Sequence, residues 1–83
     1  MKRTELKYFI GDIITFYDEE SGEERNEKVE KVEYVWRDYF GETCKYVRYN
    51  TEESSTVIDC LGDYAFVRKF ENNYPTYFIN KGV

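Results

Sequence analysis

The chain has 83 residues, a formal net charge of −5 and 35% charged side chains. A chain this short makes a single domain, residues 1–83, with a small hydrophobic core. It contains no histidine, which excludes the commonest general base, the Ser-His and Cys-His nucleophile pairs and the commonest metal ligand.

The N-terminal part of the chain has the composition of a strand. Residues 7–17 are β-branched and aromatic and have no helical period, which predicts a strand with a kink or bulge at Gly11 and Asp12. The acidic residues that follow end at Gly22, whose permissive backbone predicts a turn over 18–22.

The next segment permits two interpretations. As a helix over 22–37 it would have a capping box and three Glu–Lys or Glu–Arg pairs spaced four residues apart. As a strand, 29–37 would pair with 43–49, where polar and apolar side chains alternate. Asp38 and Gly41 would then be the first and fourth residues of a type I turn. The density of β-branched and aromatic residues before this turn favours the strand.

The C-terminal part is also divided by turn residues. Residues 56–59, 64–70 and 76–79 predict short strands. A helix over 55–69 is the alternative, although Gly62 in its middle would cost about 1 kcal/mol relative to alanine. Five or six short strands predict a mostly-β fold, either a small bent antiparallel sheet or an SH3-like barrel.

The two cysteines, Cys44 and Cys60, match no CxxC pattern. We expect two small buried thiols, with a disulfide between neighbouring strands as the alternative. No apolar run of signal-peptide length follows Met1, and no stretch approaches the ~20 apolar residues of a membrane span. We therefore expect a cytoplasmic protein without a membrane span.

Motifs for catalysis or cofactor binding are missing from the sequence. It has no Walker-type loop, dinucleotide fingerprint or zinc-ligand spacing, and its acidic run lacks the ligand spacing of an EF-hand. We expect no enzymatic activity, no cofactor and no metal.

The net charge is concentrated in residues 18–33. This segment holds eight acids and three bases, and the remaining acids and bases cancel. A local negative field of this kind attracts basic partners. Aromatic residues that follow the acidic segment can supply binding energy at the centre of an interface. The candidate partner-binding residues are Asp18, Glu19, Glu20, Glu23, Glu24, Glu27, Trp36, Tyr39 and Phe40.

These residues suggest a non-enzymatic protein-binding module that occludes a basic, nucleic-acid-binding surface of a partner protein. In size, charge and aromatic content the chain resembles the small acidic inhibitors carried by phages and mobile elements. In the simpler interpretation, the acidic run is a solvated loop and Trp36 belongs to the core.

Two further functions remain open. Exposed aromatics could serve a nucleic-acid-associated or adaptor SH3-like barrel, although scattered basic residues and the negative charge disfavour direct nucleic-acid binding. Edge strands of a small sheet also pair with copies of themselves, so a homodimer or a structural subunit of a homo-oligomer is the other alternative.

Overall fold

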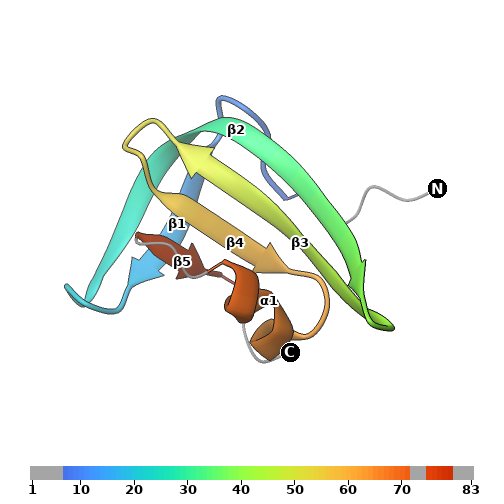
Figure 1. Cartoon of the computed structure of the whole chain (residues 1–83). Helices are drawn as coiled ribbons and strands as arrows, with labels where there is room; N and C mark the ends of the chain where they lie inside the picture. Colours follow the sequence, from blue (N-terminus) through green and yellow to red (C-terminus); the bar gives the residue numbers. More distant parts are fainter. Residues whose placement is uncertain (1–6, 72–74, 80–83) are drawn as a thin grey trace.

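The molecule is built on one five-stranded sheet. The computed structural model describes residues 7–71 and 75–79. The strands are β1 (Ile13–Asp18), β2 (Glu23–Tyr39), β3 (Glu42–Thr51), β4 (Thr56–Cys60) and β5 (Thr76–Phe78), and a single helix, α1 (Tyr64–Phe70), connects β4 to β5 among the described residues (Figure 1). In the sheet the strands follow their order in the chain.

The sheet curls into a half barrel. The ring centroids of Phe16 on β1 and Tyr77 on β5 are 4.8 Å apart, so the first and last strands approach each other. This architecture confirms the predicted mostly-β fold and is consistent with a small SH3-like fold. One pairing departs from the antiparallel prediction, because β5 runs parallel to β4. A parallel neighbour needs a crossover connection, and α1 supplies it.

The first strand is shorter than predicted. Gly11 has a φ of +97° and its N–H donates to the carbonyl of Val29. The carboxylate of Asp12 accepts a hydrogen bond from the N–H of Phe9 and closes a turn. The regular strand therefore begins only at Ile13, and 7–12 form a separate covering segment.

The second strand settles the ambiguity over 22–37, and the helical alternative is wrong. β2 is a continuous strand of 17 residues with a β-bulge between Val29 and Lys31. The bulge adds one residue, so Val29 and Val32 lie on the same side of the sheet although they are three residues apart. A three-residue spacing of apolar side chains is also typical of a helix face.

Two of the three strands predicted in the C-terminal part, 56–59 and 76–79, are confirmed as β4 and β5. Residues 56–60 form a strand, but 64–70 form a helix rather than the favoured strand. Asp63 caps this helix, because its carboxylate accepts from the N–H groups of Ala65 and Phe66. Gly62 lies before the cap, so it does not weaken the helix.

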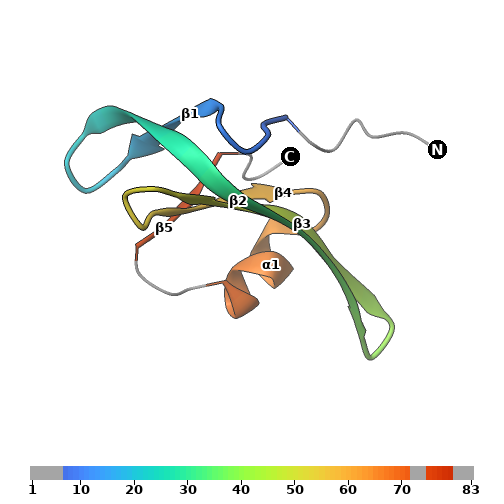
Figure 2. The ribbon, with the colours of Figure 1, turned by 90° about the horizontal axis from the view of Figure 1, so that it is seen from above.

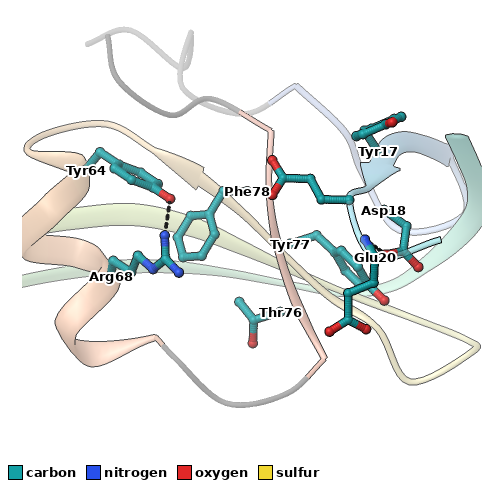
Figure 3. Close-up of a pocket in the computed structure, with 9 residues that line it drawn as sticks. Tyr17, Asp18, Glu20, Tyr64, Arg68, Thr76, Tyr77 and Phe78 are labelled. Atoms are coloured by element: carbon teal, nitrogen blue, oxygen red, sulfur yellow. Dashed lines mark hydrogen bonds between the residues drawn. The ribbon is translucent and has the colours of Figure 1, made fainter. Parts of the chain in front are cut away.

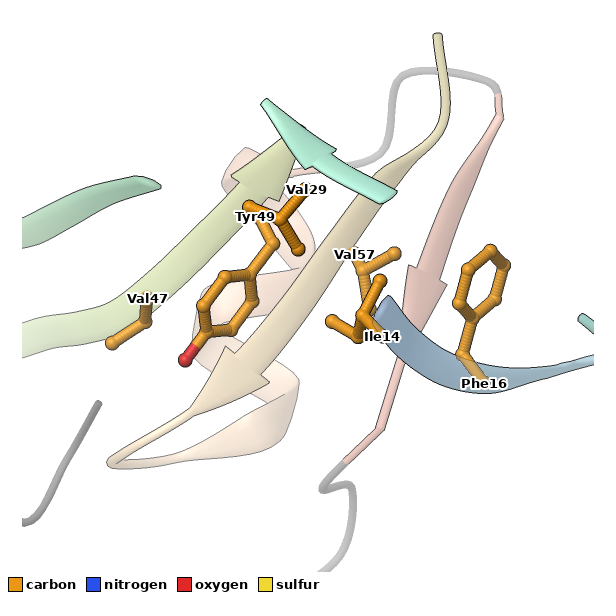
Figure 4. Packing of buried hydrophobic residues seen from close by; sticks show 6 residues of the cluster. All are labelled: Ile14, Phe16, Val29, Val47, Tyr49 and Val57. Carbon is orange, nitrogen blue, oxygen red and sulfur yellow. The ribbon is translucent and has the colours of Figure 1, made fainter. Parts of the chain in front are cut away.

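Buried side chains form two clusters, one on each side of β3 and β4. The inner core lies between these strands and the curled β1–β2 part of the sheet, and it contains Ile14, Phe16, Val29, Val47, Tyr49 and Val57 (Figure 4). The helix-side core lies under α1 and contains Val35, Cys44, Tyr46, Ile58, Cys60 and Val67. Figure 2 shows β1 and α1 on opposite sides of β3 and β4.

Both cysteines lie in the helix-side core as free, buried thiols. The predicted buried thiols are confirmed and the disulfide alternative is wrong. Burial, with a smaller contribution from the neighbouring Asp59 carboxylate, raises the pKa of Cys60 to about 12. Burial also raises the pKa of Cys44.

A polar network attaches the end of α1 to the sheet. Arg48 donates from Nη1 to the buried carboxylate of Glu71 at 2.6 Å and from Nε to Glu33 at 2.8 Å. The hydroxyl of Tyr46 donates to the same Glu71 oxygen at 2.5 Å. Burial and this hydrogen bond both raise the pKa of Tyr46, so it stays protonated and a donor.

Candidate interaction surface

The first residue of the acidic segment has a structural role. Asp18 is buried, and its Oδ1 accepts hydrogen bonds from the N–H groups of Glu20 and Ser21. Its Oδ2 lies 3.3 Å from Arg25. Burial acts to raise the pKa of Asp18, but the two turn hydrogen bonds and Arg25 outweigh it and lower the pKa. Asp18 therefore holds the β1–β2 turn in one shape and presents little surface to a partner.

Glu27 is also buried and fully paired. Thr51 donates its hydroxyl to Oε1 at 2.7 Å, and Arg25 lies 3.0 Å from Oε2. Arg25 thus bridges two of the acids that the sequence assigns to a partner-binding surface. The negative field of the acidic segment therefore comes mainly from its other, exposed carboxylates.

The other four predicted acids are exposed. They surround the β1–β2 turn and are called here the acidic turn: Glu19, Glu20, Glu23 and Glu24. Glu23 and Glu24 are opposite Asp18 and Tyr17 in the hairpin register. The ring of Tyr17 is exposed beside them. This end of the molecule therefore combines several carboxylates with an accessible aromatic ring.

A pocket lies beside the acidic turn, and its volume is about 250 Å³. Asp18 and Glu20 line it on one side, and Tyr64 and Arg68 line it on the other (Figure 3). Glu19 is also among the lining residues. Arg68 donates to the hydroxyl of Tyr64 at 2.9 Å. Ligand pockets for small molecules are usually larger than this, about 300–1,000 Å³. The pocket is of a size to receive a side chain of a partner.

The predicted aromatic residues lie on a different part of the molecule. β4 pairs with β3 only as far as Tyr46, and beyond this point β2 and β3 continue as a two-stranded hairpin. We call residues 34–46 the arm. Trp36 is 57% exposed on the arm, so it is not a core residue. Lys45 Nζ lies 4.8 Å from the centroid of its ring, within the range of a cation–π contact.

The arm ends in an unusual turn. Phe40 and Gly41 have φ values of +51° and +87°, and they are the two turn residues between β2 and β3. Two positive φ values define a type I′ turn, so the predicted type I turn from Asp38 is wrong. The Phe40 side chain is fully exposed. A bulky residue in the left-handed region is strained, and no packing of the ring compensates for this among the described residues.

Tyr39 faces the helix side of the sheet instead. Its ring stacks on Phe70 with a centroid distance of 4.5 Å and meets the edge of Phe66 at 6.1 Å. It is half-buried and connects the arm to α1. Tyr39 therefore contributes more to holding the arm in place than to an open surface.

The predicted surface is thus divided into two. The β1–β2 turn and the β2–β3 turn lie at opposite ends of the long strand β2, and both views of the ribbon separate them (Figures 1 and 2). The acidic turn and the Phe40 tip do not form one continuous patch. The sequence does not predict this division, because it carries no local signal for how far β2 extends as an uninterrupted strand.

Other exposed residues complete the two surfaces. Tyr34 lies next to Trp36, with ring centroids 6.3 Å apart, and both are on the same side of the arm as Lys45. The two-residue alternation of Tyr34 and Trp36 is visible in the sequence. The sequence does not predict that Lys45, Tyr17 and Arg68 belong to these surfaces. Their places depend on strand register and on the position of α1, and neither has a local sequence signal.

Comparisons with known proteins give no relative. No protein-family model matches the chain, and neither a curated protein nor a solved structure matches it. Within 7–71 and 75–79, no helix is long and apolar enough to cross a membrane. The same residues contain no group of three or more Cys, Asp or Glu arranged to hold a metal ion.

Proposed function

We propose that this chain is a non-enzymatic protein-binding module whose acidic turn docks on a basic surface of a partner protein. The observation that carries the proposal is the exposure of four carboxylates around one turn whose backbone Asp18 holds in place. A fixed turn loses little conformational entropy on binding. Its charge accelerates the encounter with a basic partner.

The pocket provides a contact for a partner's side chain. A lysine or arginine entering it beside Glu19 and Glu20 would meet their carboxylates and the ring of Tyr77, on the side of the pocket away from Arg68. A charged side chain in such a site forms stronger hydrogen bonds than a neutral one. The exposed ring of Tyr17 adds apolar contact area next to the carboxylates.

The expected consequence of docking is occlusion. A basic protein surface that binds nucleic acid does so through contacts to phosphates. Carboxylates on a rigid turn offer negative charge to the same lysines and arginines, so the chain would act as an inhibitor or decoy. Binding of the chain and binding of nucleic acid should then be mutually exclusive.

The test is a capture experiment with matched charge variants. One bait carries Glu19→Lys, Glu20→Lys, Glu23→Lys and Glu24→Lys. The control bait makes the same change of charge at four other exposed acids: Glu30, Glu42, Glu52 and Glu53. We expect the wild type and the control to retain the same basic protein, and an added oligonucleotide to release it. Equal capture by the acidic-turn variant, with its circular dichroism spectrum unchanged, would contradict the proposal.

A second candidate function uses the arm. Tyr34 and Trp36 are exposed next to Lys45, and aromatic rings beside cations are the usual platform for single-stranded nucleic acid. In this case a labelled single-stranded oligonucleotide binds at low salt, quenches the fluorescence of Trp36 and dissociates as salt is added. No binding at low salt would remove this candidate.

A further inference from the structure

The outer edge of β2 is unpaired over half of its length. β1 pairs with β2 only between residues 23 and 28, and Gly11 and Asp12 extend the coverage to Val29. From Glu30 to Tyr39, no backbone group in the part of the chain that the structure describes pairs with this edge. An open edge of this length, residues 30–39, is a template for another strand.

The sequence along this edge is self-complementary when read in opposite directions. If a second copy pairs antiparallel with Val35 opposite its own counterpart, Glu33 faces Arg37 and Tyr34 faces Trp36, each twice. Opposite charges and aromatic pairs directly across a strand pair are both stabilising. We propose that two copies of the chain form a dimer by antiparallel pairing of their β2 edges over residues 31–39.

The charges on the edge support this pairing. Among the described residues, Arg37 has no carboxylate within ion-pair distance, and its hydrogen bond is to the hydroxyl of Tyr39. In the dimer it would meet Glu33 of the second copy. That carboxylate already binds Arg48, which in turn binds Glu71. The pair would therefore extend an existing polar network across the interface on the helix side of the sheet.

Aromatic residues on the side of the sheet opposite α1 also support the proposed dimer. Tyr34 and Trp36 lie on the side of the sheet opposite α1 and are about half exposed. In the dimer, two of these rings from each copy would form one cluster of four across the new strand pair. Aromatic rings in such pairs attract one another beyond the effect of their buried area. An exposed aromatic pair next to an open edge is consistent with a surface that is covered in the assembled state.

Other registers are less favourable. A two-fold antiparallel pair places one residue opposite itself, so the neighbouring choices are Tyr34 and Trp36. Centring on Tyr34 places Lys31 opposite Arg37, a repulsive pair. Centring on Trp36 leaves Glu33 and Arg37 opposite uncharged residues. The charged residues on this edge therefore favour the register centred on Val35 over its two neighbours.

The dimer is independent of the proposed function. It uses the edge of the arm, whereas the acidic turn is at the other end of β2. A dimer would present two acidic turns and leave both free for partners. The charge variants of the acidic turn should not change dimerisation, so failure of one proposal is distinguishable from failure of the other.

Sedimentation velocity of the full chain over a range of concentrations tests the dimer. Arg37→Glu and Glu33→Arg each place like charges opposite one another twice, and each should raise the dimer dissociation constant by about tenfold or more. An equal mixture of the two variants restores opposite charges at both sites and should recover the dimer. Lys28→Glu makes the same charge change as Arg37→Glu on a part of β2 that β1 covers, and should leave the dimer intact.

Hydrogen exchange gives an independent measurement. Amides in residues 31–39 should be better protected in the wild type at high concentration than in Arg37→Glu. A wild type that sediments as a monomer at every concentration would overturn the proposal. Dimerisation of Arg37→Glu with wild-type affinity, or a mixture that stays monomeric while the wild type dimerises, would overturn the register and with it the proposed interface.

Discussion

The ammonium group of Lys7 lies 3.5 Å from Oδ2 of Asp59, whose carboxylate is completely buried on the inner side of β4. Neither carboxylate oxygen has a hydrogen bond within the described residues. The backbone N–H of Lys7 donates to the hydroxyl of Tyr49 at 3.0 Å. Lys7, at the start of the covering segment, is thus held over the inner core by one hydrogen bond to β3 and one ion pair to β4.

Removal of this cation should destabilise the fold. Lys7→Met leaves the charge of Asp59 buried without compensation, and we expect a loss of about 1–2 kcal/mol in the free energy of unfolding. The loss is smaller than for a fully buried pair because the Lys7 side chain is 51% exposed. Adding Asp59→Asn to this variant removes the charge and should recover most of the loss. Urea unfolding of the two single variants and the double variant measures the coupling. Wild-type stability of Lys7→Met would show that the ion pair contributes nothing.

The loss of folding stability at acidic pH should depend on Glu27. Burial acts to raise the pKa of this carboxyl, but hydrogen bonds from Thr51, Ser55 and Arg25 outweigh burial and hold the pKa below its ordinary value of 4.5. A lowered pKa in the folded state contributes stability that is fully present above pH 4.5 and is lost as the pH falls through the folded pKa. Glu27→Gln removes this contribution, since an amide does not titrate in this range.

The test therefore compares how the stability of the wild type and that of Glu27→Gln depend on pH. At about pH 7 the Glu27→Gln variant should be less stable than the wild type, and the difference should shrink as the pH falls below about 4.5. Thermal unfolding followed by circular dichroism at several pH values measures this. Glu20→Gln, at an exposed position, serves as the control. A difference that stays constant down to about pH 3 would contradict the assignment.

The turn at the tip of the arm should be open to stabilisation. Phe40 has a positive φ and a fully exposed ring, and asparagine tolerates this conformation better than any bulky residue. We expect Phe40→Asn to raise the free energy of unfolding by about 0.5–1 kcal/mol. Phe40→Ala keeps the strained backbone and loses only the ring, so it should be close to neutral. A clear loss of stability in both variants would mean that the ring has contacts that stabilise the fold.

The sequence predicted the fold class better than it predicted the surface. Two-residue alternation over 43–49 identified β3 as a strand, although alternation is typical of a half-buried strand and β3 has buried side chains on both sides. The helix over 64–70 was assigned to a strand because Tyr64, Phe66 and Val67 satisfy both the β composition and a helical face. The cap at Asp63 and the basic residues Arg68 and Lys69 in the last turn favour the helix.

The prediction of the partner-binding surface was wrong where contacts between distant residues decide which side chains are buried. Asp18 and Glu27 were predicted as surface acids, but both are buried beside Arg25. Their burial depends on the register of β1 on β2 and on the contact of Glu27 with Thr51. Such contacts join positions far apart in the chain, and no local pattern in one sequence encodes them.

The two thiols should react only when the protein unfolds. Cys44 and Cys60 are both buried in the helix-side core, and burial raises the pKa of both thiols, that of Cys60 to about 12. The thiolate is the reactive form, so native protein at about pH 8 should label very slowly with dithiobis(nitrobenzoate). Both thiols should become reactive together as urea unfolds the chain, because they share one packed cluster.

Ala65→Cys, which adds a thiol on the exposed side of α1, should give one fast-labelling group and verify the assay. Rapid labelling of the wild type without urea would mean that the packing of α1 on β3 and β4 opens in the native state.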